Sequence, residues 1–107
     1  MTDAEFLSLA DATLEAVRRA LDRVELDADV VSKGEGVLEM EFDDGAKIVI
    51  NRHAPAHEIW VAARSGGFHF RHDGKQWRDT RDGAELFAAL SRLVSAQAGT
   101  AVILAPG

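Results

Sequence analysis

The residues of this sequence that could do chemistry are mostly carboxylates, and they are unevenly distributed. Residues 1–45 hold thirteen Asp and Glu against four Lys and Arg, a net charge of −9, whereas residues 46–107 hold five against eight, a net charge of +3. Within the acidic part, Asp27 and Asp29 are two residues apart, so in an extended segment their carboxylates project to the same side. Oxygen ligands of this kind suit hard cations without rigid geometry. We therefore expect an acidic end that attracts cations or a basic protein surface.

The other reactive side chains do not form a catalytic or zinc site. The sequence has no cysteine, so a thiolate nucleophile and sulfur ligands are excluded, and any metal must be held by oxygen or imidazole. His69 and His72 are three residues apart in a predicted strand, which sends them to opposite faces. His57 and Glu58 could form a local hydrogen bond, but no nucleophile is placed beside them. We predict that the protein is not an enzyme.

Composition and charge set further limits. The chain has 107 residues, enough for one hydrophobic core, and its net charge of −6 disfavours nucleic acid, whose binders neutralise phosphates with basic side chains. No apolar run is long enough to span a membrane, and the N-terminus begins with acidic residues in place of a signal peptide. We expect one domain over residues 1–107, with a tail over residues 99–107, in the cytoplasm of a bacterial cell.

Two amphipathic helices are predicted to position these residues, one near each end of the chain. The segment "TDAEF" fits a capping box, with Thr2 as N-cap and Glu5 reaching back to it, and one-sided helical periodicity follows. The second helix is expected to begin at "DGAEL", with Asp82 as N-cap and Glu85 at the third helical position. It is expected to end near Gly99, because glycine favours the left-handed conformation that terminates helices.

Between the helices, apolar residues alternate with polar ones, as in strands with one buried face. The pattern predicts about six short strands, with a tight hairpin turn at Asp43 to Gly45. The links are too short for parallel crossovers, so the sheet should be mainly antiparallel. Both helices are expected to pack on one face of it, giving an α+β two-layer sandwich whose other face meets water or a partner. Residues 102–104 of the tail are expected to dock between the helices, with fraying as the alternative.

Trp60 is predicted to lie on the face of its strand that should meet water. If Ile59 and Val61 point toward the helices, the period of two places Trp60 on the open face. Glu58 and Asn51 should share that face. An exposed tryptophan is uncommon without a pocket or an interface to fill. Trp60 is either an anchor for a partner protein or a side chain covered by arginine and lysine stems, and the pattern alone leaves both open.

The segment "GVLEMEFDDGAKIVINRHAPAHEIWVAARSGGFHF", followed by "WRD" and "DGAELFAALSRL", resembles the frataxin family, in particular the CyaY-type frataxins of bacteria. The resemblance covers nearly the whole chain. The residues at the spacing of that family are Asn51, Pro55, Ile59, Trp60, the Gly66–Gly67 pair and Phe70. The frataxin fold is an antiparallel sheet with two helices on one face, in agreement with the fold expected from the periodicity.

This resemblance implies a small iron-binding protein of iron–sulfur cluster assembly, without an organic cofactor. Frataxins bind a cysteine desulfurase, and bacterial members regulate cluster assembly on the scaffold protein or supply iron to it. The residues that match the family's docking surface for desulfurase and scaffold are Asn51, His53, Pro55 and Trp60. His53 stands where glutamine is usual. The expected state is a monomer that can assemble around iron.

The same resemblance places the metal site on an exposed ridge of carboxylates at the end of the first helix and on the first strand. The residues that match this acidic ridge are Asp22, Glu25, Asp27 and Asp29. Weak binding of Fe2+ or Fe3+ is expected there. Relatives commonly carry acids where this sequence has Arg18, Arg19 and Lys33, and Arg23 adds a further positive charge. A merely solvated acidic face is therefore the alternative. In that case the protein would be an interaction adaptor anchored by Trp60, with incidental metal binding.

Overall fold

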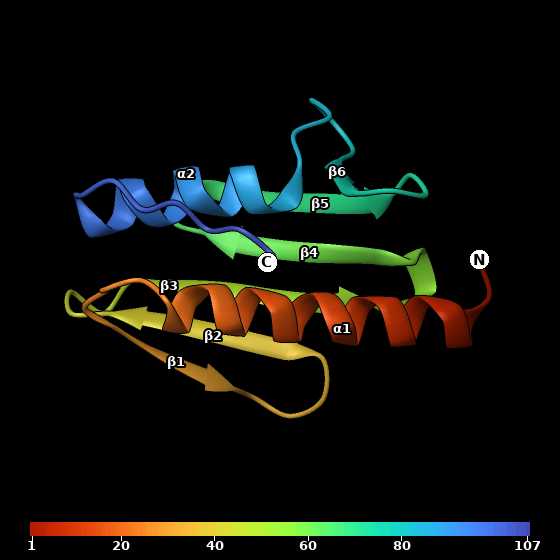
Figure 1. The fold of residues 1–107 in the computed structure, drawn as a ribbon, viewed down its shortest axis with the longest axis horizontal. Helices are drawn as coiled ribbons and strands as arrows, with labels where there is room; N and C mark the ends of the chain where they lie inside the picture. Colours follow the sequence, from red (N-terminus) through yellow and green to blue (C-terminus); the bar gives the residue numbers. More distant parts are fainter.

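The computed structural model describes all 107 residues and contains two α-helices and six β-strands. The elements are α1 (Asp3–Asp22), β1 (Ala28–Ser32), β2 (Val37–Phe42), β3 (Lys47–His53), β4 (Glu58–Ala63), β5 (Gly66–His72), β6 (Trp77–Asp79) and α2 (Leu86–Ala98). The strands pair in sequence order, and every pairing is antiparallel. Both helices lie on one side of the sheet (Figure 1), which confirms the predicted two-layer α+β sandwich.

The core lies between the helices and the sheet, and the two periodicities of the sequence supply it. The buried side chains of α1 recur at helical spacing; they are Phe6, Ala10, Leu14, Val17, Ala20 and Leu21. In the central strands every second residue faces the helices, and the buried ones are Leu38, Met40, Phe42, Ile48, Ile50, Ile59 and Val61. Each large aliphatic side chain covered in this way contributes about 1.5–3 kcal/mol. Burial of one face of each element therefore decides which sheet face the helices cover.

Two local signals of the sequence are confirmed. Thr2 and Glu5 form the capping box: Glu5 N–H donates to Thr2 Oγ1 at 3.1 Å, and Thr2 N–H donates to Glu5 Oε1 at 2.9 Å. In the hairpin between β2 and β3, Gly45 has a φ of 85° and donates its N–H to Phe42 O at 2.9 Å. That φ lies in the left-handed region that glycine occupies without a steric cost.

The predicted start of α2 is wrong by one turn. The helix begins at Leu86, and its N-cap is Glu85, whose carboxylate accepts from Phe87 N–H at 2.7 Å and from Ala88 N–H at 3.2 Å. Asp82 instead accepts from Ala84 N–H at 2.9 Å in the preceding turn. Glu85 forms an isolated antiparallel bridge with Arg78, which keeps this segment extended beside β6. The extended backbone therefore takes precedence over the helix propensity of this segment. The predicted end is confirmed, because Gly99 is the C-cap at a φ of 72°.

The tail docks against the helix layer, as expected. Val102 and Leu104 are buried, whereas Ile103 between them is 81% exposed. Two serines of α2 bind the tail backbone: Ser95 Oγ accepts from Val102 N–H at 2.8 Å, and Ser91 Oγ accepts from Leu104 N–H at 2.8 Å. In Figure 1 the tail turns back along α2 and ends between the two helices. The tail is therefore held by hydrogen bonds as well as by apolar contacts.

Replacing Ser91 and Ser95 together with alanine should destabilise the fold by about 1–3 kcal/mol, because two buried N–H groups of the tail would lose their acceptors. Chemical denaturation would measure the loss, and amide hydrogen exchange at Val102 and Leu104 would locate it. Ser8→Ala is the control, since Ser8 is an exposed residue of α1 and its replacement brings the same gain in helix propensity. Equal stability changes for the control and for each single replacement would contradict this account.

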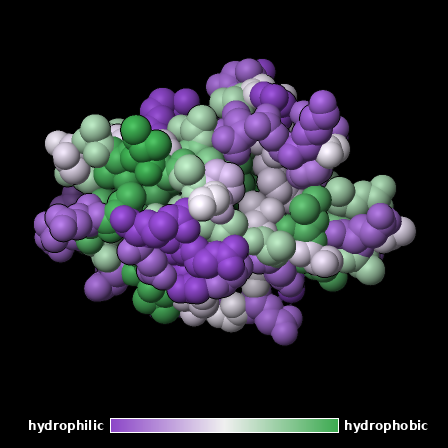
Figure 2. Space-filling model, viewed as in Figure 1, coloured by the Kyte–Doolittle hydropathy of each residue, from purple (hydrophilic) through white to green (hydrophobic).

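The helix side of the molecule presents a mixed surface. Figure 2 shows hydrophilic side chains over the C-terminal half of α1 and hydrophobic ones beside the end of α2, where the tail turns back. The exposed charged residues in the C-terminal half of α1 are Glu15, Arg19 and Asp22. Neither helix combines the length and the apolar character that a bilayer crossing requires.

Candidate functional site

The candidate docking site is on the sheet face that the helices leave open. Ile59 and Val61 are buried against the helices, so Trp60 between them projects from the opposite face, as the period of two predicted. Trp60 is directly opposite Asn51 of β3 and His69 of β5 in the strand register. These three residues form one row across the middle of the open face.

Both faces of the Trp60 indole are covered by imidazoles. The His53 ring stacks on one side, with centroids 3.7 Å apart and an interplanar angle of 10°, and the His69 ring stacks on the other at 4.5 Å and 11°. We call this arrangement of His53, Trp60 and His69 the three-ring stack. His53 Nδ1 is buried and has no hydrogen-bond partner. The side chains that cover Trp60 are therefore histidines instead of the arginine and lysine stems considered as an alternative.

A buried carboxylate fixes the orientation of the indole. Glu58 is only 6% exposed although it lies on the open face. Its Oε1 accepts from Trp60 Nε1–H at 2.9 Å, and its Oε2 accepts from Arg71 Nη2–H at 2.7 Å. Burial by itself raises the pKa of Glu58, but the hydrogen bonds from Trp60 and Arg71, with the charges of Arg71 and His69, outweigh it and lower the pKa below its ordinary value. Glu58 is therefore an ionised partner for Trp60 near neutral pH.

The remaining predicted docking residues border the three-ring stack. Asn51 lies beside Trp60 in the row, and its Nδ2–H donates to Arg52 O at 3.2 Å. Pro55 is exposed in the 3-10 helix Ala54–Ala56, which joins the end of β3 to the start of β4. The structure thus places Asn51, His53 and Trp60 together on the sheet and Pro55 on the loop that follows His53.

His57 does not form the local contact with Glu58 that the sequence suggested. Its backbone adopts a left-handed conformation with a φ of 54°, and its ring stacks on Phe6 with centroids 5.1 Å apart. Its Nε2 is 2.6 Å from Asp3 Oδ1. His57 therefore joins the loop after β3 to the start of α1, on the helix side of the sheet.

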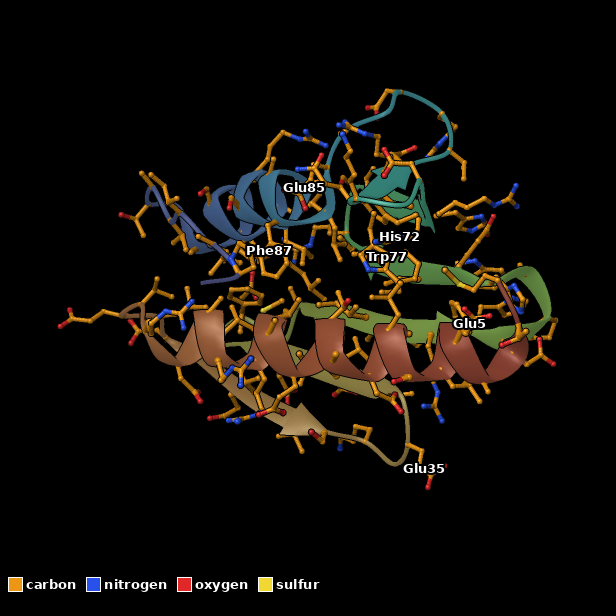
Figure 3. All side chains as sticks on the ribbon, turned by 45° about the vertical axis from the view of Figure 1, so that its right-hand side comes forward. Glu5, Glu35, His72, Trp77, Glu85 and Phe87 are labelled. Carbon is orange, nitrogen blue, oxygen red and sulfur yellow. The ribbon has the colours of Figure 1, made fainter.

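His69 and His72 face opposite sides of the sheet, as predicted. His72 lies on the helix side, where its ring meets Trp77 edge to face with centroids 5.0 Å apart. Figure 3 shows His72 beside Trp77, with Trp77 and Phe87 projecting into the space between the helices. Because His69 lies on the open face, the two imidazoles cannot share a metal ion.

The four residues of the acidic ridge are exposed, but they do not converge on one point. Asp22, the last residue of α1, pairs with Arg18 at 2.8 Å. Glu25 and Asp27 line a hollow of about 440 Å³ at this end of the molecule. Asp29 lies on β1, opposite Glu41 in the strand register. No group of three or more histidine and carboxylate side chains is close enough to hold a metal ion in this conformation.

Sequence reasoning missed two further carboxylates at the acidic end. Asp43 and Asp44, in the turn between β2 and β3, line the same hollow as Glu25 and Asp27. Asp44 is partly neutralised by Arg64, whose Nη2 is 3.3 Å from Asp44 Oδ2, and Gln97 Nε2–H donates to the same oxygen at 3.1 Å. The turn was identified from the sequence, but its proximity to residues 25–27 depends on how the hairpin packs beside the end of α1.

The chain was compared with known proteins. The family model described as a frataxin-like domain matches residues 1–100. The iron-sulfur cluster assembly protein CyaY of Dechloromonas aromatica is 55% identical over 104 residues, covering 97% of this chain and 99% of that protein. The protein of the same name from Janthinobacterium sp. is 53% identical over 109 residues, covering 97% of this chain and 96% of that protein.

Two solved structures are also similar. Frataxin from Psychromonas ingrahamii superposes with a TM-score of 0.88 at 30% identity, covering 96% of this chain and 97% of that chain. Trimeric frataxin from the yeast Saccharomyces cerevisiae, complexed with ferrous iron, superposes with a TM-score of 0.72 at 26% identity. The yeast match covers 85% of this chain and 86% of that chain. The resemblance identified from the sequence is thereby confirmed.

Proposed function

Because this chain belongs to the frataxin family, we propose that it is an iron-binding protein of iron–sulfur cluster assembly that docks a cysteine desulfurase and its scaffold protein. It regulates cluster assembly or supplies iron to it, without catalysing a reaction or holding an organic cofactor. It acts in the bacterial cytoplasm as a monomer that can assemble around iron. The name of the curated relatives and the ferrous iron in the yeast structure support the pathway and the metal.

The observation that supports docking most strongly is the three-ring stack on the open sheet face. Trp60 is a large aromatic side chain held in one orientation by Glu58, so little conformational freedom would be lost when a partner binds. Aromatic side chains at the centre of a desolvated contact contribute much of the binding energy in protein interfaces. Asn51 and the exposed Pro55 extend the same surface.

The acidic ridge supports the iron-binding part of the proposal. Glu25 and Asp27 share a hollow with Asp43 and Asp44, so four carboxylates surround one depression of the surface. Exposed carboxylates bind hard cations through water and through one or two direct oxygen ligands, which gives weak affinity. The charge of residues 1–45 would also guide a basic partner surface toward this end.

The second candidate is an adaptor for which metal binding is incidental. It is favoured by the absence of any converging set of three ligands and by the pairing of Asp22 with Arg18. The two candidates share the docking surface of Trp60. They differ in whether the carboxylates of the acidic ridge determine the affinity for iron.

Replacing the acidic ridge with neutral isosteres should weaken Fe2+ binding about tenfold or more, because the ligands and most of the local field would be lost. The variant is Asp22→Asn, Glu25→Gln, Asp27→Asn and Asp29→Asn, and calorimetry under anaerobic conditions would measure the affinity. The fold should remain intact, since all four side chains are exposed.

A matched pair of double variants separates a local site from general charge. Glu25→Gln with Asp27→Asn alters the hollow, whereas Glu35→Gln with Asp82→Asn removes the same charge from exposed residues that do not line it. We expect the Glu25→Gln, Asp27→Asn variant to bind iron more weakly than wild type, and the Glu35→Gln, Asp82→Asn variant to bind it as wild type does. Unchanged affinity in the quadruple variant would refute the proposed metal role and leave the adaptor.

A further inference from the structure

The three-ring stack leaves the edge of the Trp60 indole for a partner. Both faces of the Trp60 indole are covered, and its single N–H is used by Glu58. Two charged or titratable side chains of β5 lie at the surface beside Trp60. They are the imidazole of His69, which is 48% exposed, and the guanidinium of Arg71, which is 65% exposed. His69 and Arg71 are two residues apart on β5, so both project from the open face.

The two histidines of the stack differ in the groups that would surround a proton added at Nδ1. His69 Nδ1 is 3.8 Å from Glu58 Oε1, so a proton there gains an ionised carboxylate at the distance of an ion pair. His53 Nδ1 is buried without a partner, so a proton there would be a buried donor with no acceptor, which is costly. Imidazole ordinarily changes charge between about pH 5 and 8. His69 is therefore the member of the stack whose imidazole lies beside a carboxylate.

The charged groups that face the stack are few. Glu58 of β4 is neutralised by Arg71 of β5. In β6, Arg78 is opposite Arg71, but its guanidinium is bound to Asp73 at 3.0 Å. The other strands place uncharged Val37 and Asn51 in the row of Trp60, and Lys33, whose backbone N–H donates to Val37 O, lies at its far end. With His69 neutral, the charge beside Trp60 is close to zero. With His69 protonated, it is positive.

We propose that His69 is a protonation-dependent docking residue, whose imidazolium, together with Arg71, binds a carboxylate of an acidic segment on the partner. This inference rests on the docking proposed for the face of Trp60 and specifies the chemistry of the partner there. In the protonated ring both nitrogens carry a hydrogen. His69 Nδ1–H then donates toward Glu58, and Nε2–H is directed to the surface. The cation also lies over the indole face, which adds a cation–π attraction to the stack. Partner affinity therefore rises as the pH falls.

The titration of the stack can be observed without any partner. The chain has two tryptophans, so a proton–nitrogen NMR spectrum contains two indole N–H signals. The Trp60 signal should shift between about pH 8 and pH 6, and the shift should disappear in His69→Gln but persist in His53→Gln. His72→Gln is the matched control, because His72 is on the same strand but contacts Trp77 on the other side of the sheet. A Trp60 signal that shifts equally in His69→Gln would overturn the assignment.

Partner affinity is then measured with a purified bacterial cysteine desulfurase and, separately, its purified scaffold protein, at about pH 8, 7 and 6. Wild type and His72→Gln should bind roughly fivefold more tightly at the lowest pH than at the highest, and His69→Gln should show no such gain. His53→Gln should keep the gain. Comparison between variants removes any pH dependence that belongs to the partner itself. At higher salt the gain should shrink, because the contact is between partly exposed charges.

The outcomes separate this inference from the docking proposal. If wild type binds at every pH and His69→Gln follows the same pH profile, the protonation role is wrong while docking stands. If wild type binds neither protein at any pH, the docking proposal and this inference both fail. If the gain survives at about 0.5 M salt, it does not come from a carboxylate of the partner, and the acidic segment is refuted. If the gain is lost in His53→Gln instead, the residue assignment is refuted.

Discussion

Trp60→Ala is expected to weaken binding to the desulfurase or the scaffold about thirtyfold or more, while the protein stays folded. The replacement removes the central ring of the three-ring stack and leaves His53 and His69 without a surface between them. It also removes the N–H that Glu58 accepts. Because Trp60 is outside the core, the loss in unfolding free energy should be about 1–2 kcal/mol, from the stacking contacts and one hydrogen bond.

A conservative variant distinguishes the shape of the ring from its hydrogen bond. Trp60→Phe keeps an aromatic ring between the imidazoles but cannot donate to Glu58, so we expect a smaller loss of affinity than for alanine. Pull-down from native lysate with wild type and Trp60→Ala would identify the partners that are lost, and titration with the purified proteins would give the affinities. Unfolding of Trp60→Ala would contradict the docking role, because it would assign the side chain to the stability of the fold.

Trp77→Ala should have the opposite profile, with a large loss of stability. Trp77 is 5% exposed, and its Nε1–H donates to Thr13 Oγ1 of α1 at 2.9 Å. Its ring also meets Phe6 edge to face at 6.0 Å. Truncation of a buried tryptophan costs about 3–5 kcal/mol, so much of the stability of a small domain would be lost. Denaturant titration followed by circular dichroism would measure the change.

The control for Trp77 is Trp77→Phe, which keeps an aromatic ring but removes the five-membered part of the indole with its bond to Thr13. It should cost about 1–2 kcal/mol, and any folded fraction should bind the desulfurase normally because Trp77 is on the helix side of the sheet. A loss below about 1 kcal/mol for Trp77→Ala would show that Trp77 does not join β6 to α1 as described.

The contrast between these two tryptophans shows what the sequence could predict. The period of two around Ile59 and Val61 was enough to place Trp60 on the open face, because the alternation of side chains along a strand is local geometry. The capping box at Thr2 and the hairpin at Gly45 were also predictable, since both depend on contacts between near neighbours in sequence. One-sided periodicity in two helices then fixed the two-layer architecture.

The parts that could not be predicted depend on register and on contacts distant in sequence. The covering of Trp60 by His53 and His69 requires the pairing of β3 with β4 and of β4 with β5, which the alternation alone does not determine. The burial of Glu58 requires Arg71, thirteen residues away. The start of α2 was misplaced because the bridge between Arg78 and Glu85 is a tertiary contact that takes precedence over local capping.

The candidate metal site shows the same limit. Composition identified the acidic end, and the family resemblance selected four of its carboxylates. Where the carboxylates lie depends on the packing of the hairpin between β2 and β3, which adds Asp43 and Asp44 to Glu25 and Asp27. Asp22 is engaged by Arg18 one turn earlier in α1. The paired charge variants test which of these carboxylates carry the proposed iron binding.

The order of the strands has a consequence for the kinetics of folding. Each strand of the sheet pairs only with its neighbours in sequence. The pairing of two consecutive strands therefore closes only a short loop. Such a sheet has low contact order for its strand content and can assemble hairpin by hairpin. The contacts that close the longest loops are those of α1 and its C-cap, such as Thr13 with Trp77 across 64 positions and Arg23 with Ala105 across 82. We therefore expect the docking of α1 against β6 and the tail to carry the largest loop-closure entropy of the fold.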